Sequence, residues 1–547
     1  MKNYPLNTVD CYEDFKTLID KIREKYQDAA AISSYNDAGE LRAKTYSELT
    51  ADVYALAEEL LDRGLAGKHI AIVSQNSYMF AAALLSVAYI GGVAVPIDVE
   101  QPYEIIKSMA SFADCELIFI SDSVLDDIEG EDIFDGKPII ILSDSEGIDN
   151  GFYGMVDRGN KLIAERGRKS EGITVAPSST AMIVYTSGTA SVSKPVMLSH
   201  LALLTNACES ARLIASPGRI FSSLPMYHIY GFTCALLNSL INGAEICVNG
   251  DIRFMLRDLT LFKPAGIMAV PLIAEMICKR LVDVAEGENK QVGTGLFLFG
   301  KKAASETLKP DAKLVAVKEQ LFPGLEMMIC GGAHLSENIS KTLYRFGILL
   351  LEGYGITECA PIISANRNEF YKMGTVGIVL PSYEIKIEDG EILVKGKCLM
   401  SGYYKQEEMT REAIVDGWYK TGDLGYIDNS GFLVITGRKK NIIVLKNGKK
   451  VSPEELENIL GAVPMIKEAM VYGSSVGNVA DDVVPAVTIY PDPNQTRGMA
   501  AYEILSELQN AIDLINEGLP AFKQIRLINI RENEFVKTST KKIKRVK

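Results

Sequence analysis

A turn rich in small hydroxyl side chains reads Tyr-Thr-Ser-Gly-Thr-Ala-Ser-Val-Ser-Lys over residues 185–194. Its side-chain hydroxyl donors are Thr186, Ser187 and Thr189. Gly188 lets the backbone approach a ligand closely, and Lys194 can bring a positive charge to a phosphate. Serine, threonine and glycine also gather at ordinary hairpin tips, because they satisfy local backbone demands. The turn by itself leaves a polyphosphate cradle and a plain hairpin tip as alternatives.

Two further glycine-rich segments follow apolar runs that are typical of buried strands. One reads Cys-Gly-Gly-Ala over residues 330–333, and the other reads Leu-Glu-Gly-Tyr-Gly-Ile-Thr-Glu over residues 351–358. Glycines at strand ends let a flat ring or a phosphate lie against the backbone. Tyr354 offers a stacking face, and Thr357 places a hydroxyl donor beside Glu358, a carboxylate that can bind a metal ion. A nucleotide fits these demands.

Three other positions have side chains suited to binding or catalysis, but the local sequence around each is less specific. His228 lies in a turn between a strand and a helix, where a histidine is more often structural. Asp423 lies in a tight turn and could accept hydrogen bonds from ribose hydroxyls, although aspartate is also a common turn residue. Arg438 opens a basic run through Lys440, and such runs are usually solvated surface. The P-loop and the dinucleotide-binding glycine fingerprint are both absent from the sequence.

Length, net charge and cysteine content exclude several classes of protein. A chain of 547 residues is too long for one hydrophobic core. A net charge of -13 argues against broad affinity for nucleic acid or anionic membranes. Nine cysteines without a Cys-x-x-Cys pair indicate free buried thiols in a reducing cytoplasm, and the first residues lack the apolar segment of a secretory signal. Glycine and proline interrupt the apolar stretch 79–97, so we expect no membrane span.

Strands that alternate with helices predict a parallel α/β sheet. A Thr45/Glu48 capping box opens the first clear helix, and the alternation runs from residue 69 to residue 120. It resumes over residues 201–270, after an acidic segment, 121–171, that we interpret as a surface excursion. Short alternating strands from residue 374 onward predict a β-rich subdomain. Beyond Arg438 the pattern is that of a small α+β unit.

The order and spacing of these motifs along nearly the whole chain resemble those of the adenylate-forming superfamily, which contains acyl-CoA synthetases, luciferases and peptide-synthetase adenylation domains. The motif segments are 185–194, 224–231, 331–333, 354–358, 421–423, 437–440 and 537–545. Residues 374–457 most resemble the long-chain fatty acyl-CoA synthetase branch. The resemblance implies an α/β fold in which a large N-terminal domain, residues 1–438, has two α/β sheet subdomains and a β-rich subdomain. A small mobile α+β lid, residues 439–547, follows a hinge at Lys440.

The resemblance also implies an AMP-forming acid-thiol ligase that uses ATP and Mg²⁺. Lys542 would bridge the substrate carboxylate and the α-phosphate, Thr357 would meet that phosphate, Glu358 would hold the metal, and His228 would lie between the acyl and thiol pockets. The implied nucleotide-binding residues are Thr186, Ser187, Gly188, Thr189, Lys194, Gly331, Gly332, Ala333, Glu352, Gly353, Tyr354, Gly355, Asp423 and Arg438. Asp423 and Arg438 would bind the ribose, and Gly332 and Tyr354 the adenine.

The sequence defines the acid substrate and the thiol acceptor less closely. Residues 224–237 lack the carboxylate that amino-acid-activating relatives use, which favours a fatty or related acid. The acceptor is CoA or, alternatively, a carrier-protein phosphopantetheine, and peripheral membrane contact is compatible with a fatty substrate. A degenerate, non-catalytic nucleotide- or acyl-binding protein is a second alternative, because several positions depart from the family pattern. Those positions are Ser191, Ser193, Pro195, Val536 and Lys541.

Overall fold

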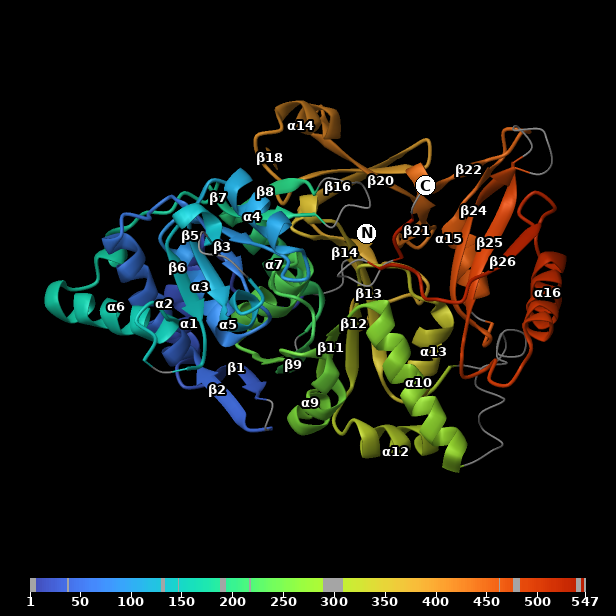
Figure 1. Cartoon of the computed structure of the whole chain (residues 1–547), viewed down its shortest axis with the longest axis horizontal. Helices are drawn as coiled ribbons and strands as arrows, with labels where there is room; N and C mark the ends of the chain where they lie inside the picture. Colours follow the sequence, from blue (N-terminus) through green and yellow to red (C-terminus); the bar gives the residue numbers. More distant parts are fainter. Residues whose placement is uncertain are drawn as a thin grey trace.

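The structure is a computed structural model that describes residues 6–36, 39–128, 133–145, 147–186, 193–215, 218–288, 308–461, 463–475, 483–537 and 543–545. Figure 1 shows a blue N-terminal part at one end, a red C-terminal unit at the other and a large sheet between them. The mixed α/β architecture that the alternation predicted is therefore confirmed.

The first sheet has seven strands in the order β18-β8-β7-β4-β3-β5-β6. Their bounds are β3 His69–Val73, β4 Val93–Pro96, β5 Cys115–Ser121, β6 Ile139–Leu142, β7 Thr180–Tyr185, β8 Pro195–Ser199 and β18 Gly402–Tyr403. Strands β7 and β8 pair antiparallel, so the hydroxyl-rich turn connects the two strands of a hairpin. The helices of this part are α1 Phe15–Tyr26, α2 Tyr46–Asp62, α3 Tyr78–Tyr89, α4 Tyr103–Phe112, α5 Asp122–Leu125 and α6 Phe152–Arg166.

The second sheet has nine strands in the order β15-β14-β13-β12-β11-β9-β10-β1-β2. Their bounds are β1 Ala30–Tyr35, β2 Leu41–Thr45, β9 Arg219–Ser222, β10 Glu245–Val248, β11 Gly266–Ala269, β12 Met327–Cys330, β13 Leu349–Gly355, β14 Ile362–Ala365 and β15 Ile378–Val379. The strands from β1 to β13 pair in parallel, so their carboxyl ends meet at one edge. That edge carries residues 331–333 and 353–358.

Helices cover this second sheet and join it to the first. They are α7 His200–Leu213, the π-helix Gly231–Leu237, α8 Asn238–Asn242, α9 Met255–Phe262, α10 Pro271–Glu288, α12 Ala312–Leu321 and α13 Glu337–Arg345. Helix α7 begins directly after β8 and packs against both β8 and β14, so it spans the two sheets. Among the described residues, no helix combines the length and the apolar character that a membrane crossing requires.

A third, five-stranded sheet forms the β-rich part that the sequence predicted. Its strands are β16 Tyr383–Glu388, β17 Glu391–Gly396, β19 Ile414–Val415, β20 Trp418–Ile427 and β21 Leu433–Arg438, with helix α14 Glu407–Ala413 beside them. Strands β20 and β21 pair antiparallel, and Asp423 stands directly opposite Arg438. The register of this hairpin therefore brings two of the predicted site residues together.

The C-terminal unit has a hydrophobic cluster of its own, built from buried side chains between Ile443 and Ile525. Its elements are β22 Ile443–Val444, β23 Lys450–Val451, α15 Pro453–Leu460, β24 Ile466–Ser475, β25 Val483–Pro491, α16 Ala501–Glu517 and β26 Leu527–Ile530. Strands β24, β25 and β26 form a three-stranded sheet. The C-terminal unit therefore has the α+β composition that the sequence predicted.

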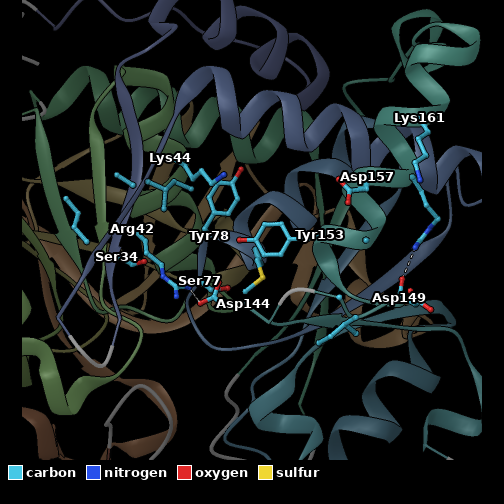
Figure 2. A pocket seen from close by; sticks show the side chains of 18 residues that line it. Ser34, Arg42, Lys44, Ser77, Tyr78, Asp144, Asp149, Tyr153, Asp157 and Lys161 are labelled. Carbon is cyan, nitrogen blue, oxygen red and sulfur yellow. Dashed lines mark hydrogen bonds and ion pairs between the residues drawn. The ribbon is translucent and has the colours of Figure 1, made fainter.

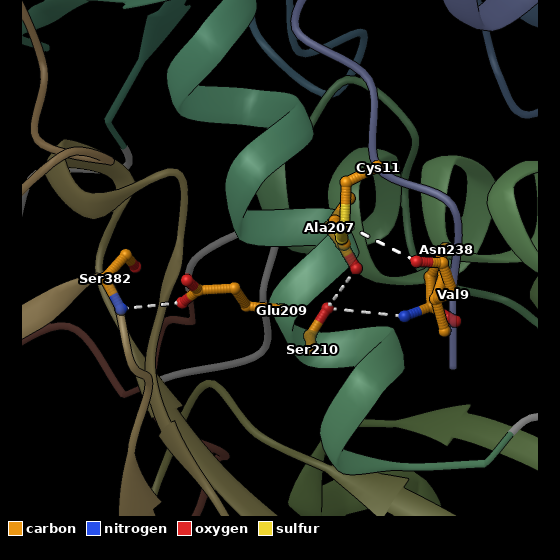
Figure 3. Close-up of a disulfide and its surroundings, with 8 residues drawn as sticks. Val9, Cys11, Ala207, Glu209, Ser210, Asn238 and Ser382 are labelled. Carbon is orange, nitrogen blue, oxygen red and sulfur yellow. Dashed lines mark hydrogen bonds between the residues drawn. A yellow bond between two sulfur atoms is a disulfide. The ribbon is translucent and has the colours of Figure 1, made fainter. Parts of the chain in front are cut away.

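Two sequence-based expectations are wrong. The acidic segment 121–171 is no mere surface excursion, because it supplies edge strand β6 of the first sheet and helix α6, which packs on α2. The cysteines are not all free, since Cys11 and Cys208 form a disulfide with their Cα atoms 5.5 Å apart (Figure 3). This bond ties the segment before α1 to α7. The other seven cysteines are free and buried, as predicted.

Candidate active site

The described site residues gather where the carboxyl edge of the nine-stranded sheet meets the β20–β21 hairpin. The hydroxyl of Tyr354, at the end of β13, donates to Asp423 Oδ2 at 2.6 Å. Arg438 Nε lies 2.8 Å from the other carboxylate oxygen, Oδ1. The Asp423 side chain is only 4% exposed, so its charge depends on these two partners. Burial and the nearby Asp423 charge raise the pKa of Tyr354 well above its usual value, which keeps its hydroxyl a donor.

Asp423 lies within strand β20 and not in the tight turn that the sequence predicted, and Thr421 holds the irregular stretch of β20 that carries it. Thr421 Oγ1 donates to the carbonyl of Ile392 on β17 at 2.7 Å and accepts from the Asp423 backbone N–H at 3.0 Å. The Thr421 hydroxyl therefore holds the Asp423 backbone in place, which orients the Asp423 carboxylate. This is the local reason for a Thr-Gly-Asp sequence at residues 421–423.

Glu358 lies in a single 3-10 turn, Thr357–Cys359, that follows β13. The residue is 8% exposed, and Tyr403 donates to its Oε1 at 2.9 Å. The Tyr419 hydroxyl lies 3.4 Å from that of Tyr403, and Lys194 Nζ lies 5.1 Å from the centre of the Tyr403 ring. The arrangement places a largely buried carboxylate, which is a hard oxygen ligand for a divalent cation, beside the end of the hydroxyl-rich turn.

Several cations face the same region from different elements. Burial lowers the pKa of Lys440 below its usual value, and the positive charges of Arg438, Lys194 and Arg545 lower it further. Arg545 comes from the end of the chain and pairs with Glu457 on α15 at 2.5 Å. Cations that repel one another in a partly buried place favour an anion of multiple charge, such as a polyphosphate.

Glycines permit close backbone contacts around these side chains. Gly355 lies so near the Pro361 carbonyl that an added Cβ would be 2.2 Å from its oxygen. Gly332 has a φ of +89°, a conformation that glycine adopts without strain. At the start of the C-terminal unit, a Cβ on Gly437 would lie 2.3 Å from Ser452 Oγ and 2.9 Å from Glu454 Oε2. Only the absence of a side chain lets β21 and the N-terminus of α15 approach this closely.

Three predicted site residues, Glu352, Gly353 and His228, have their described contacts outside the group formed by Tyr354, Asp423 and Arg438. The Glu352 carboxyl accepts from the Gly374 backbone and lies near Glu337 on α13; burial, and to a lesser extent Glu337, raise its pKa to about 7. Gly353 follows it and pairs with Ala365 on β14. His228 lies at the turn before the π-helix, where its Nδ1 accepts from the Tyr230 backbone N–H at 3.2 Å.

Four predicted residues, Ser187, Gly188, Thr189 and Lys542, lie outside the described residues. Their flanks are described. Thr186 and Lys194 close the hydroxyl-rich turn through a backbone hydrogen bond of 3.0 Å. Lys537 and Ile543 form an antiparallel bridge, so the segment with Lys542 connects two paired positions. Gly331 and Ala333 follow β12 at the same sheet edge, and Gly331 lies against the buried Tyr230 ring.

The site contains residues that the sequence reasoning missed. Tyr403 donates to Glu358, the Tyr419 hydroxyl lies 3.4 Å from that of Tyr403, and Asn206 of α7 binds the turn behind Glu358. The tyrosines lie in strands whose register with β8 and β17 cannot be inferred from local patterns. A buried asparagine within a helix is the one signal that sequence alone offered for Asn206.

A cavity of about 1100 Å³ lies elsewhere, between β2, the start of α3 and α6. Figure 2 shows Tyr78 and Tyr153 beside each other in it, with Arg42 and Asp144 close to Ser77. Its charged side chains are of both signs, and it contains none of the predicted site residues.

Comparisons with known proteins match both parts of the chain. The AMP-binding enzyme family matches residues 19–404, and the AMP-binding enzyme C-terminal domain matches residues 440–547. Long-chain-fatty-acid–CoA ligase FadD15 of Mycobacterium bovis is 27% identical over 516 residues, which are 88% of this chain and 84% of that protein. Long chain acyl-CoA synthetase 4 of Arabidopsis thaliana is 33% identical over 341 residues, 54% of this chain and only half of the relative.

Solved structures share the fold along almost the whole chain. The anthranilate CoA ligase AuaEII in complex with anthranoyl-AMP has a TM-score of 0.78 at 16% identity and covers 98% of this chain, with 96% of its own length matched. O-succinylbenzoate coenzyme A synthetase from Bacillus subtilis, in complex with ATP and magnesium ion, has a TM-score of 0.73 at 21% identity, with 96% and 98% covered.

Proposed function

The chain belongs to the AMP-binding enzyme family, and on that premise we propose that it is an ATP-dependent acid-thiol ligase. It converts a carboxylic acid to an acyl adenylate and then to a thioester. The observation that carries the proposal is the linked group of Tyr354, Asp423 and Arg438 beside the buried Glu358. The Asp423 carboxylate can accept hydrogen bonds from ribose hydroxyls and the Arg438 guanidinium can donate to them. The Tyr354 ring offers a flat face on which an adenine can stack.

The first step joins two anions, so neutralising charge is the main demand on the site. A carboxylate oxygen attacks the α-phosphorus of ATP, and pyrophosphate leaves. Lys194, together with Ser187 and Thr189, holds the β- and γ-phosphates, and Thr357 donates toward the α-phosphate. Lys542 draws the substrate carboxylate to that phosphate. In the second step a thiol sulfur attacks the acyl carbonyl, and AMP leaves.

The residues at Glu358 fit a magnesium ion. A magnesium site in nucleotide enzymes uses one or two carboxylates, with phosphate oxygens and water supplying the rest. Among the described residues no cluster of three metal-binding side chains occurs, and Glu358 is a nearly buried carboxylate near Lys194. The ion, when bound, neutralises the phosphates and polarises the reacting phosphoryl group. The chain's own contribution is to orient Glu358 through Tyr403.

We assign residues 1–438 to the large domain and residues 439–547 to a lid that turns at Lys440. The separate hydrophobic cluster of the C-terminal unit supports this boundary, because a unit with its own core can move as a body. Rotation at Lys440 exchanges the Lys542 segment for the loop around Gly448 at the site. His228 then separates the acyl pocket from the thiol path.

The acid is a fatty or related acid and the acceptor is CoA. Phe232 and Met268 belong to the apolar cluster that packs against Tyr354, and the segment 268–272 spans the carboxyl end of β11; such apolar surroundings suit an alkyl or aryl chain. Long-chain acyl-CoA ligases among the relatives agree with this choice. A carrier-protein phosphopantetheine is the alternative acceptor, since its thiol chemistry is the same.

ATP–pyrophosphate exchange with fatty, aromatic and amino acids tests the proposal. We expect exchange with fatty or aryl acids and little with amino acids. No exchange with any acid, alongside measurable ATP binding, would indicate the degenerate binding protein instead. Lys542→Ala is expected to abolish exchange yet spare thioester formation from a supplied acyl adenylate. Lys544→Ala is the matched control, because Lys544 lies in the same segment and its backbone, not its side chain, bonds Val536.

A further inference from the structure

Asn206 lies in the middle of helix α7 and is wholly buried. Asparagine is a poor residue for a helix interior, because its side chain competes for backbone hydrogen bonds. A buried amide must also find partners. The reason for an asparagine here therefore lies in what its side chain binds.

The amide of Asn206 binds the backbone on both sides of the turn that follows Glu358. Its Nδ2 donates to the Ile362 carbonyl at 2.7 Å and to the Cys359 carbonyl at 3.2 Å. Its Oδ1 accepts from the Ile362 N–H at 3.1 Å. The two donor hydrogens and the acceptor oxygen are thus all used, which fixes the amide orientation and the turn together.

The turn needs such support. Glu358 sits in a helix of only three residues, which is too short to hold its own shape. Ala360 directly after it has a φ of +65°, a left-handed conformation that is unfavourable for a residue with a Cβ. Tyr383 on β16 adds one more hydrogen bond, from its hydroxyl to the Cys359 carbonyl at 2.6 Å. Helix α7 and β16 therefore hold the turn from outside.

We propose that Asn206 is a positioning residue for Glu358. Its amide clamps residues 359–362 to α7 and so fixes the carboxylate that receives the magnesium ion. This inference rests on the proposed function, because it assigns Glu358 to the metal. Asn206 itself touches neither nucleotide nor acid, and its influence passes through the turn.

Two variants and a control test the clamp in the full-length protein. Asn206→Ala removes all three hydrogen bonds, and Asn206→Asp keeps the size and an acceptor oxygen but loses both N–H donors. Asn249→Ala is the matched control, since Asn249 is also buried and donates to Asp258 Oδ2 at 2.9 Å, within a different core region. Each variant is measured for thermal unfolding, exchange rate and the Mg²⁺ concentration that gives half of the maximal rate.

We expect both Asn206 variants to lower the maximal exchange rate about 10- to 100-fold and to raise the half-saturating Mg²⁺ concentration severalfold, as residues that orient metal ligands do. Asn249→Ala should leave the Mg²⁺ dependence unchanged even where its unfolding temperature falls equally. An Asn206→Ala enzyme with wild-type Mg²⁺ dependence would overturn the proposal and leave Asn206 a packing residue only.

Amide hydrogen exchange of the protein without substrates gives a second readout. The Ile362 N–H is bonded to Asn206, so it should exchange faster in Asn206→Ala while other β14 amides stay protected. Unchanged exchange there would overturn the clamp even if activity falls. If the wild-type protein activates no acid, the proposed function fails, whereas calorimetric titration of Mg²⁺ and ATP into both proteins still decides whether Asn206 supports metal binding.

Discussion

The Tyr354 hydroxyl donates to the Asp423 carboxylate across 69 residues of sequence, at 2.6 Å. This bond joins the end of β13 in the nine-stranded sheet to β20 in the β-rich sheet. Arg438 completes the group from the neighbouring strand. The residues proposed to bind the nucleotide are therefore held by two separate sheets, and each bond within the group can be tested by substitution.

Asp423→Asn should lower kcat/KM for ATP by about 100-fold. The change keeps the shape but removes the charge that pairs with Arg438, and a hydrogen bond to a charged group contributes about 1.5–3 kcal/mol. Initial rates of ATP–pyrophosphate exchange measure the effect. Asp428→Asn is the control, because Asp428 pairs with Lys372 at 2.6 Å away from the group. Equal losses in the two variants would contradict a specific role for Asp423.

Tyr403→Phe should reduce the exchange rate by about 3- to 10-fold and weaken the response to Mg²⁺. The ring stays, but Glu358 loses the hydroxyl that orients its Oε1. Tyr404→Phe removes a hydroxyl that donates to Asp114 at 2.7 Å instead, and it should behave as wild type. Wild-type Mg²⁺ dependence in Tyr403→Phe would show that the tyrosine does not orient Glu358.

Glu352→Gln should stabilise the protein more at pH 8 than at pH 5. The folded pKa is about 7, whereas an unfolded glutamate has a pKa of about 4.3. A raised acid pKa gives stability below the unfolded pKa that is lost as pH rises through the folded pKa. Glutamine removes this loss, worth about 2–3 kcal/mol between the two pH values. Thermal unfolding at both pH values measures it.

Glu369→Gln is the control for that pH comparison, because Glu369 is exposed. Its unfolding midpoint relative to wild type should not change with pH. A Glu352→Gln midpoint that gains no more at pH 8 than at pH 5 would mean that the carboxyl is solvated and titrates normally.

Thiol titration of the denatured, unreduced protein should find seven thiols, because two of the nine cysteines form the Cys11–Cys208 bond. Reduction should raise the number to nine. Cys208→Ser should give eight thiols without reductant, since Cys11 then has no partner. Nine thiols in the unreduced wild-type protein would show that the bond does not form under the conditions of preparation.

Local patterns predicted most of the strands and helices that carry the site. The capping box at Thr45 and Glu48 was found as predicted, with both reciprocal hydrogen bonds. The segment 121–171 was mispredicted because β6 and α6 are defined by packing on β5 and α2, and acidic composition does not reveal such packing. The Cys11–Cys208 pairing spans 197 residues and depends on tertiary structure alone.

The candidate site could be predicted as a list of residue types but not as a set of contacts. Asp423 and Arg438 were assigned from motif order, and the hairpin register now explains why they meet. Tyr403 was missed because it reaches Glu358 only through the pairing of β18 with β8. Asn206 was missed because its partners lie more than 150 residues away.

Gly437 has no side chain, so β21 packs directly against residues of the C-terminal unit at this position. The Ser452 hydroxyl donates to the Thr436 carbonyl at 2.7 Å. A methyl group on residue 437 would clash with this hydroxyl, and moving the hydroxyl away would break that hydrogen bond. Gly437→Ala should therefore push β21 and the C-terminal unit apart at this contact. Substitution of Gly437 would therefore change the contact between β21 and the C-terminal unit without altering any side chain of the proposed nucleotide site.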